Sequence, residues 1–219
     1  MVKAILFDMD GVLIDTERLN LEFMIEVAKE FGCTIDPDDI LSLRSASQEE
    51  CDIYYRSRYG EDFDFYAIRD ERRKRICQHI EENGLELKDG VEKVLDHVDA
   101  KGLKKAVVTS TEYDRAMGYI RMLDIEDRFD TIVSASMVRN GKPDPDVYVY
   151  ASGIIGERPW DCIAVEDSHN GVRSAYNAGC MVAVVPDLAE ADEDMRKMGT
   201  WVLDSIDQLI GIMDELLRE

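Results

Sequence analysis

The chain has 219 residues, of which 45% are hydrophobic and 33% charged, and its net charge at pH 7 is −21. A chain of this length can bury about 70% of the surface that its unfolded form exposes, so it needs no disulfide or metal in order to fold. So large a negative charge repels nucleic-acid phosphates and anionic lipids, and we therefore expect no nucleic-acid partner and no membrane association.

The cysteines and the N-terminal segment bear on the cellular compartment. The five cysteines are scattered along the chain without a C-x-x-C pair, which indicates free thiols in a reducing compartment. The N-terminal segment reaches the acidic residue Asp8 too soon for a signal peptide, and no apolar run is long enough to span a bilayer. We expect a cytoplasmic protein that is a monomer or a weak homodimer.

Short apolar runs alternate with helical patterns over most of the chain. The predicted strands are 4–7, 105–109, 131–133, 162–165, 181–185 and 201–203. The predicted helices that alternate with them are 91–101, 113–123, 146–153, 170–177 and 206–217. Near-continuous strands of Val, Ile and Ala that alternate with helices are typical of a parallel sheet covered on both faces. Gly102 and Gly179 are expected near helix C-termini, and Ser205 with Gln208 is a predicted capping box for the last helix.

The segment 16–87 interrupts this alternation, because it contains helical patterns only. A first pattern begins with Thr16 as its cap, a second begins with a capping box of Ser47 and Glu50, and a third spans about 64–83. An all-helical insert of this size after the first strand predicts a separate domain.

We therefore predict an α/β fold with two parts. Residues 1–15 and 88–219 form a Rossmann-like parallel sheet core with helices on both faces, and residues 16–87 form an inserted all-helical cap domain. Ligands of open α/β sheets bind beyond the carboxyl ends of the strands. An insert that leaves this edge could close over the ligand site.

Two aspartates directly follow the first predicted strand, in the sequence Asp8-Met9-Asp10-Gly11. Residues two apart on an extended chain point the same way, so both carboxylates can face one pocket. Such a pair can hold a hard cation, and one member can attack phosphorus while the other moves a proton. Because Asp and Gly are also common in turns, the motif alone is equally compatible with a polar turn.

A threonine and a lysine extend this pattern. Thr109 ends a predicted strand, and its hydroxyl together with the N–H groups that follow can bind phosphate oxygens, although Ser and Thr are also frequent helix caps. Lys142 lies in the sequence Gly-Lys-Pro-Asp-Pro, where two prolines restrict the backbone. A lysine there can bind a phosphoryl oxygen or neutralise a carboxylate, although most lysines are simply solvated at the surface.

Glu166 and Asp167 follow the predicted strand 162–165. Two adjacent acids at a strand end can bind a cation, and Asp167 or Ser168 could also cap the next helix. Each of the four motifs follows a separate predicted parallel strand, so all four should meet at one edge of the sheet. Together they would supply a nucleophile, a proton carrier, an anion-binding group and a magnesium site.

The order Asp8-x-Asp10, Thr109, Lys142-Pro143 and Glu166-Asp167 resembles the haloacid dehalogenase-like hydrolase superfamily over the whole chain. The stretches FDMDGVLIDT, GKPDPDVY and EDSHNGVRSA are similar to the branch with a helical cap after the first motif. That branch contains β-phosphoglucomutase and many sugar-phosphate and phosphoglycolate phosphatases.

The resemblance implies a role for each matching position. Asp8 would attack phosphorus and form an aspartyl-phosphate, and Asp10 would protonate the leaving oxygen and then activate the acceptor. Thr109 would bind a phosphoryl oxygen, and Lys142 would hold Asp8 and the phosphoryl group together. The implied Mg²⁺ ligands are Asp8, the backbone carbonyl of Asp10, Asp167, and Glu166 directly or through water. The expected substrate-binding residues are Gly11, Ser110, Thr111, Arg44 and Asn20.

The chain departs from the mutase pattern in its predicted cap. Where the mutases have a histidine that restrains the general acid, this sequence carries Asn20, which makes water a better acceptor than a second sugar hydroxyl. The mutase glycine before the substrate arginine is also replaced, because Leu43 precedes Arg44. The basic cluster around Arg72 on the third helical pattern is more typical of a solvated helix face with interleaved acids than of a phosphate site.

We therefore predict a Mg²⁺-dependent phosphatase that hydrolyses a small phosphorylated metabolite, such as a sugar phosphate. The alternative is a phosphohexomutase similar to β-phosphoglucomutase, which shares every core residue and differs in the fate of the intermediate. A non-catalytic phosphate-binding protein is a further alternative, and the presence of all four charged core residues, Asp8, Asp10, Lys142 and Asp167, argues against it.

Overall fold

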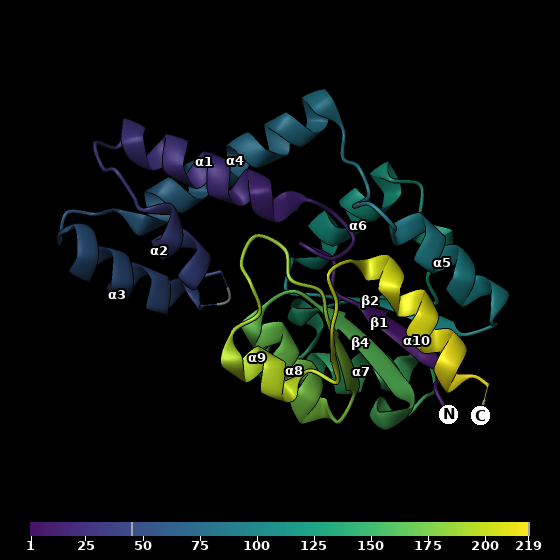
Figure 1. The fold of residues 1–219 in the computed structure, drawn as a ribbon. Helices are drawn as coiled ribbons and strands as arrows, with labels where there is room; N and C mark the ends of the chain where they lie inside the picture. Colours follow the sequence, from purple (N-terminus) through teal and green to yellow (C-terminus); the bar gives the residue numbers. More distant parts are fainter. Residues whose placement is uncertain (45, 219) are drawn as a thin grey trace. The chain divides into compact units, whose positions relative to one another are not determined.

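The computed structural model describes residues 1–44 and 46–218, so Ser45 and Glu219 lie outside the described residues. The chain forms two compact units, which we name the sheet unit (residues 1–15 and 85–219) and the helical unit (residues 16–84) (Figure 1). Residues 85–87, assigned to the insert from the sequence, group with the sheet unit. The reason is that Leu87 forms a β-bridge with Ile14, and the N–H of Lys88 donates to the carbonyl of Leu13 at 2.9 Å.

Among the described residues, six strands form one sheet in the order β3-β2-β1-β4-β5-β6. Their bounds are β1 Ala4–Phe7, β2 Lys104–Thr109, β3 Thr131–Ser134, β4 Cys162–Glu166, β5 Met181–Val184 and β6 Trp201–Val202. Every pair of neighbouring strands is parallel, which confirms the predicted α/β fold. Because β1 lies between β2 and β4, the three motifs that end these strands come to neighbouring positions at one edge.

Helices cover both faces of the sheet. They are α5 (Val91–Ala100), α6 (Tyr113–Met122) and α10 (Leu209–Leu216) on one face, and α7 (Asp146–Ile154), α8 (His169–Ala178) and α9 (Glu193–Met198) on the other. In β1, Ile5 and Phe7 belong to the apolar core of the first face, whereas Ala4 and Leu6 belong to that of the second. Successive side chains of a strand point to opposite faces, so a strand buried on both must be apolar throughout.

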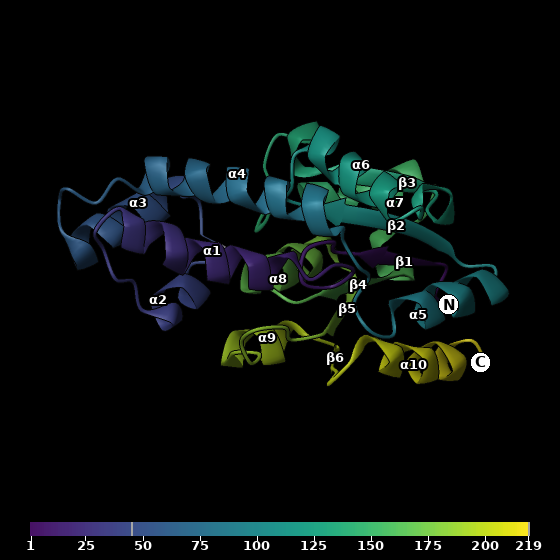
Figure 2. The ribbon, with the colours of Figure 1, turned by 90° about the horizontal axis from the view of Figure 1, so that it is seen from above.

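The helical unit contains α1 (Thr16–Glu30), α2 (Pro37–Ser42), α3 (Gln48–Tyr59) and α4 (Phe65–Asn83). Figure 2 shows α1 and α4, the two longest helices of the unit, side by side. Their apolar faces share one core with α2 and α3, to which Met24, Tyr55 and Ile68 contribute buried side chains. The rings of Tyr55 and Phe63 stack with centroids 5.1 Å apart. The unit therefore has a hydrophobic core of its own.

The predicted helix ends are partly confirmed. The capping box of α3 is present, because the Ser47 hydroxyl accepts from the N–H of Glu50 at 3.2 Å and the Glu50 carboxylate accepts from the N–H of Ser47 at 2.7 Å. The capping box of Ser205 and Gln208 is wrong. The Ser205 hydroxyl donates instead to the carboxylate of Asp207 at 2.5 Å, and residues 206–208 form a turn of 3-10 helix before α10. Thr16 lies in the first turn of α1 rather than before it.

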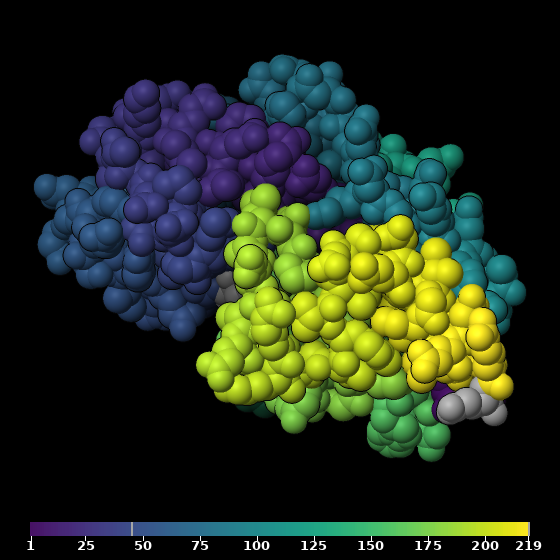
Figure 3. All heavy atoms as spheres, viewed as in Figure 1, coloured from purple at the N-terminus to yellow at the C-terminus, as the bar shows by residue number. Residues whose placement is uncertain are grey.

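The last helix, α10, is buried on one side only. Leu209 and Met213 are fully buried in the core that includes α5, whereas other atoms of α10 form part of the molecular surface in Figure 3. Across residues 1–44 and 46–218, no helix combines the length and the apolar content that a bilayer crossing requires. The cytoplasmic location stays a prediction.

Substituting Ser47→Ala is expected to destabilise α3 by about 1 kcal/mol, because it leaves the N–H of Glu50 without its side-chain acceptor. Hydrogen–deuterium exchange of the α3 amides should accelerate roughly fivefold. The control is Ser57→Ala in the same helix, where an exposed hydroxyl donates to the carbonyl of Tyr54, and exchange should barely change. Equal acceleration in both variants would contradict the capping role of Ser47.

Candidate active site

The carboxyl ends of three neighbouring strands bring the predicted polar residues together. Asp8 directly follows β1, and its N–H donates to the carbonyl of Val165 in β4 at 2.9 Å. Thr109 is the last residue of β2, and Glu166 is the last residue of β4. Because parallel strands end at the same edge, side chains that lie far apart in the sequence become neighbours there.

Lys142 joins the ends of these strands. Its ammonium donates to the Asp8 carboxylate at 2.5 Å, to the carbonyl of Val108 at 2.9 Å and to the Glu166 carboxylate at 2.6 Å. An ammonium has three N–H donors, so these three acceptors fix its orientation. The side chain is only 5% exposed. The surface role considered for this lysine is therefore excluded by its burial.

Three buried carboxylates lie together at this edge of the sheet, and the Lys142 ammonium contacts two of them. Asp8, Glu166 and Asp167 each offer an oxygen atom, and these atoms lie within 4.8 Å of one another. Burial, followed by the charge of Glu166, raises the pKa of Asp8 well above its ordinary value, although Lys142 opposes this rise. Burial lowers the pKa of Lys142, but attraction to Asp8 and Glu166 outweighs it and raises that pKa. The site keeps a charged ammonium and an excess of negative charge, an arrangement that suits a divalent cation.

Asp10 is held by two threonine hydroxyls. Its carboxylate accepts from the Thr111 hydroxyl at 2.8 Å and from the Thr109 hydroxyl at 3.3 Å. The Thr109 hydroxyl in turn accepts from the N–H of Thr111 at 2.9 Å. Ser110, between the two threonines, is exposed. The loop after β2 therefore reaches the loop after β1, and its hydroxyls contact the side chain expected to move the proton.

Two glycines leave room for the carboxylates. Gly11 has a φ of +84°, and a Cβ atom there would lie 2.3 Å from a carboxylate oxygen of Asp167. A Cβ atom on Gly171 in α8 would lie 1.9 Å from the carboxylate of Glu166. Only glycine lets the backbone approach this closely. At Gly11 the sequence suggested substrate binding, and the structure adds a steric reason for the residue.

The remaining predicted substrate-binding residues lie in the helical unit. Asn20 is part of α1, and its amide donates to the Glu17 carboxylate at 3.5 Å. Arg44 lies in the turn that follows α2 and is partly buried. The structure thus groups the predicted core residues in the sheet unit, and the roles of Asn20 and Arg44 stay predictions.

The basic cluster on α4 is engaged mainly within the helical unit. Arg75 pairs with acidic residues of α1 and with Glu71, and Arg69 pairs with Asp70. Arg72 differs, because its guanidinium contacts the sulfur of Met24 at 3.7 Å. The predicted pairing with interleaved acids is confirmed, but the predicted solvated face is not, because only Lys74 of these basic residues is exposed.

Tyr148 in α7 is a site residue that sequence reasoning missed. It is fully buried, and its hydroxyl donates to the Glu166 carboxylate at 2.5 Å. The sequence gives only a weak indication of this role, because a tyrosine at an apolar position of a helix normally indicates core packing.

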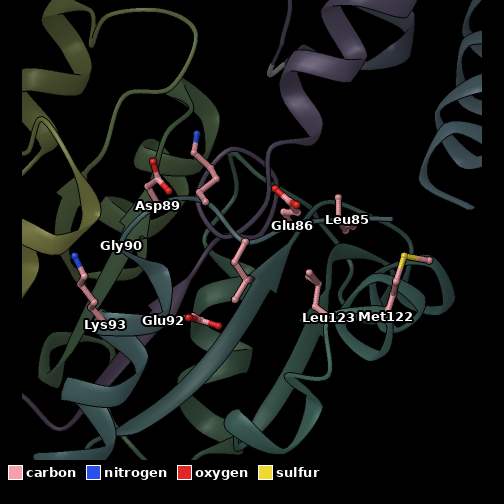
Figure 4. Close-up of a pocket in the computed structure, with 10 residues that line it drawn as sticks. Leu85, Glu86, Asp89, Gly90, Glu92, Lys93, Met122 and Leu123 are labelled. Atoms are coloured by element: carbon pink, nitrogen blue, oxygen red, sulfur yellow. The ribbon is translucent and has the colours of Figure 1, made fainter. Parts of the chain in front are cut away.

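A surface hollow of about 480 Å³ lies elsewhere in the sheet unit (Figure 4). It is lined by residues 85–90 together with Glu92, Lys93, Met122 and Leu123. None of these residues is among the predicted site residues. We therefore do not assign the substrate to it.

Comparison with known proteins agrees with this geometry. The family model described as Haloacid dehalogenase-like hydrolase matches residues 5–185. A phosphorylated carbohydrates phosphatase of Thermotoga maritima is 30% identical, over 99% of this chain and all of its own length. Hexitol phosphatase A of Escherichia coli is 29% identical, over 94% of this chain and 93% of its own. Among solved structures, a similar one is that of a CbbY variant from Rhodobacter sphaeroides in complex with xylulose-1,5-bisphosphate. Its TM-score is 0.77 at 26% identity, and the match covers 95% of this chain and 96% of that one.

Substituting Gly171→Ala is expected to lower the free energy of unfolding by about 1–3 kcal/mol, because the new methyl group would overlap the buried carboxylate of Glu166. The control is Gly118→Ala in α6, where a Cβ atom meets nothing within 4 Å and helix propensity should give a gain of up to about 1 kcal/mol. Urea denaturation of both variants measures the difference. Similar stability of the two would contradict the close contact at Gly171.

Proposed function

Because the chain belongs to the haloacid dehalogenase-like hydrolase family, we propose that it is a Mg²⁺-dependent phosphatase acting through an aspartyl-phosphate on Asp8. Its substrate would be a small phosphorylated metabolite, a sugar phosphate or a similar monoester. Two relatives named as phosphatases, one of phosphorylated carbohydrates and one of hexitol phosphates, support this class. The observation that carries the proposal is the contact between Lys142 and Asp8 inside the buried group of carboxylates.

The residues present fit a divalent metal ion. Asp8, Glu166 and Asp167 gather hard oxygen atoms in a buried place, and one lysine does not balance their charge. We propose that Asp8, Asp167 and the backbone carbonyl of Asp10 hold Mg²⁺, with Glu166 bound directly or through water. When bound, the ion would neutralise charge on the phosphoryl oxygens.

Asp8 is proposed as the nucleophile. One of its carboxylate oxygens forms a bond to phosphorus, while the bond from phosphorus to the leaving oxygen breaks. Lys142, held against Asp8 at 2.5 Å, keeps the carboxylate in place and offers positive charge to the phosphoryl group. Thr109 and the backbone N–H of Ser110 would bind the phosphoryl oxygens. The N–H of Gly11 donates to the carbonyl of Ile14 and that of Thr111 to the Thr109 hydroxyl, both at 2.9 Å. Phosphoryl transfer depends chiefly on such positioning and charge stabilisation.

Asp10 is proposed as the general acid and base. It would give its proton to the leaving oxygen and then take a proton from the water that breaks the bond between phosphorus and Asp8. The hydroxyls of Thr109 and Thr111 hold its carboxylate in the site. A positioned general acid typically contributes about 10²–10⁴-fold in rate.

The helical unit is proposed as the cap that selects the substrate. Arg44 and Asn20 are its proposed contacts with the part of the substrate beyond the phosphate. Asn20 lacks the acid–base chemistry of the mutase histidine, so water is the proposed acceptor of the phosphoryl group. Conversion of β-glucose 1-phosphate to glucose 6-phosphate, in the presence of a trace of the bisphosphate, would identify a mutase instead.

Substituting Asp8→Asn is expected to abolish phosphate release from p-nitrophenyl phosphate in the presence of Mg²⁺, with a loss of at least about 10³-fold in kcat, because an amide cannot attack phosphorus. The control is Asp114→Asn at an exposed position of α6, which should retain wild-type turnover. Equal turnover by wild type and Asp8→Asn would contradict the role of Asp8. Absence of turnover by wild type on a panel of phosphorylated metabolites would contradict the enzyme itself.

Magnesium affinity is expected to rise with pH. The raised pKa of Asp8 means that a proton competes with the metal ion at low pH, so binding should release a proton and tighten until the pH exceeds that pKa. Calorimetric titration in two buffers of different ionisation enthalpy measures the released proton. The Asp8→Asn variant should lose this dependence, whereas a wild-type affinity that does not change with pH above the ordinary pKa of an aspartate would contradict it.

A further inference from the structure

Tyr148 is buried inside the charged site but has no part in the chemistry described so far. It lies in α7, on the face of the sheet covered by α7, α8 and α9. Its hydroxyl donates to the Glu166 carboxylate at 2.5 Å, and the Lys142 ammonium lies 5.3 Å from the centre of its ring. One side chain therefore contacts both the lysine and the acid that anchors this lysine.

Glu166 is fixed from several directions. Its side chain is fully buried, and the same oxygen atom accepts from both Lys142 and Tyr148. The other oxygen accepts from the Ser168 hydroxyl at 3.4 Å. Gly171 closes the space behind the carboxylate, since a methyl group there would overlap it. Among these contacts, Tyr148 provides the shortest hydrogen bond to the acid.

The phenol of Tyr148 is a hydrogen-bond donor to Glu166, at 2.5 Å from its carboxylate oxygen. A neutral phenol can give one hydrogen bond to a carboxylate, and a bond to a charged acceptor is stronger than a neutral one. The ring also offers its negative face to the ammonium of Lys142.

We propose that Tyr148 is a positioning residue, which holds Glu166 in the orientation that keeps the Lys142 ammonium against Asp8. This inference rests on the proposed phosphatase function, because it assigns Tyr148 to the same site. Without the phenol, Glu166 loses one of the two donors on the oxygen that binds Lys142. The ammonium then loses a fixed acceptor, and its distance from the nucleophile becomes less defined.

The consequence falls on the chemical step rather than on binding. Most of the substrate affinity would come from the bound metal ion, the N–H of Ser110 and the contacts beyond the phosphate, which keep their positions when the phenol of Tyr148 is removed. A displaced lysine affects the charge that develops during transfer, and misplacement of a catalytic group by about 1 Å can cost about 10²-fold in rate. A purely structural role would instead lower the stability and leave the turnover of the folded fraction unchanged.

The test compares Tyr148→Phe with Tyr150→Phe, a tyrosine that is 44% exposed on the same helix. With p-nitrophenyl phosphate and saturating Mg²⁺, kcat of Tyr148→Phe should fall by about 10- to 100-fold while KM changes by less than about threefold. Tyr150→Phe should match wild type. Calorimetry with Mg²⁺ should give Tyr148→Phe an affinity within about threefold of wild type, because Asp8, Asp167 and the backbone carbonyl of Asp10, three of the proposed ligands, are unchanged. A kcat within twofold of wild type, or a fall in Mg²⁺ affinity as large as the fall in kcat, would overturn the proposal.

A double-mutant cycle with Glu166→Gln shows whether Tyr148 acts through this acid. In the Glu166→Gln background, adding Tyr148→Phe should change kcat by less than about twofold, because the partner of the phenol is already altered. A full 10-fold further loss would overturn the proposal. The double variant can still be measured if Tyr148→Phe alone folds poorly. Removing the buried charge of Glu166 together with its phenol donor is better tolerated than removing the donor alone.

The outcomes distinguish failure of the proposed phosphatase function from failure of the proposed role of Tyr148. A wild-type protein that releases no phosphate from any tested monoester contradicts the phosphatase function and, with it, the role of Tyr148. An active wild type whose Tyr148→Phe variant keeps full kcat contradicts the positioning role alone.

Discussion

The candidate site depends on one ammonium group held between two buried carboxylates. Lys142 contacts Asp8 at 2.5 Å and Glu166 at 2.6 Å, and it is almost completely withdrawn from solvent. Buried charges are costly unless they are paired and hydrogen-bonded, so neither acid can lose this lysine without leaving an uncompensated charge in the interior. The same pairing places a positive group beside the proposed nucleophile. The same interaction therefore contributes to the stability of the sheet edge and to the proposed phosphoryl transfer.

The overall charge of the chain makes this local arrangement necessary. At −21, the protein as a whole repels a phosphorylated substrate. Salt screens charges that lie more than about 8 Å apart, so the distant carboxylates of the chain have little effect at the site. Oxygen atoms of Asp8, Glu166 and Asp167 lie within 4.8 Å of one another, so salt does not screen these three charges from one another. A lysine and a divalent ion at this point would reverse the sign of the local field where the phosphate has to bind.

The sheet and its charged edge could be predicted from the sequence, because strands buried on both faces are apolar throughout and each ends in a polar motif. The two shortest helices, α2 and α9, were missed, since six residues are too few to show a helical period. The predicted capping box at Ser205 is wrong because the Ser205 hydroxyl donates to the carboxylate of Asp207. Tyr148 could not be recognised, because its partner Glu166 lies 18 residues further along and is brought to it only by the packing of α7 against the sheet.

The most direct measurement is to search for a phosphorylated form of the enzyme. The protein would be mixed with a good substrate and Mg²⁺, quenched in acid within the first turnover, digested and examined by mass spectrometry. We expect one added phosphoryl group on the peptide that contains Asp8, and its absence when the substrate is omitted. Rapid turnover with no phosphorylated peptide at any quench time, or with the group on another residue, would contradict the nucleophilic role of Asp8.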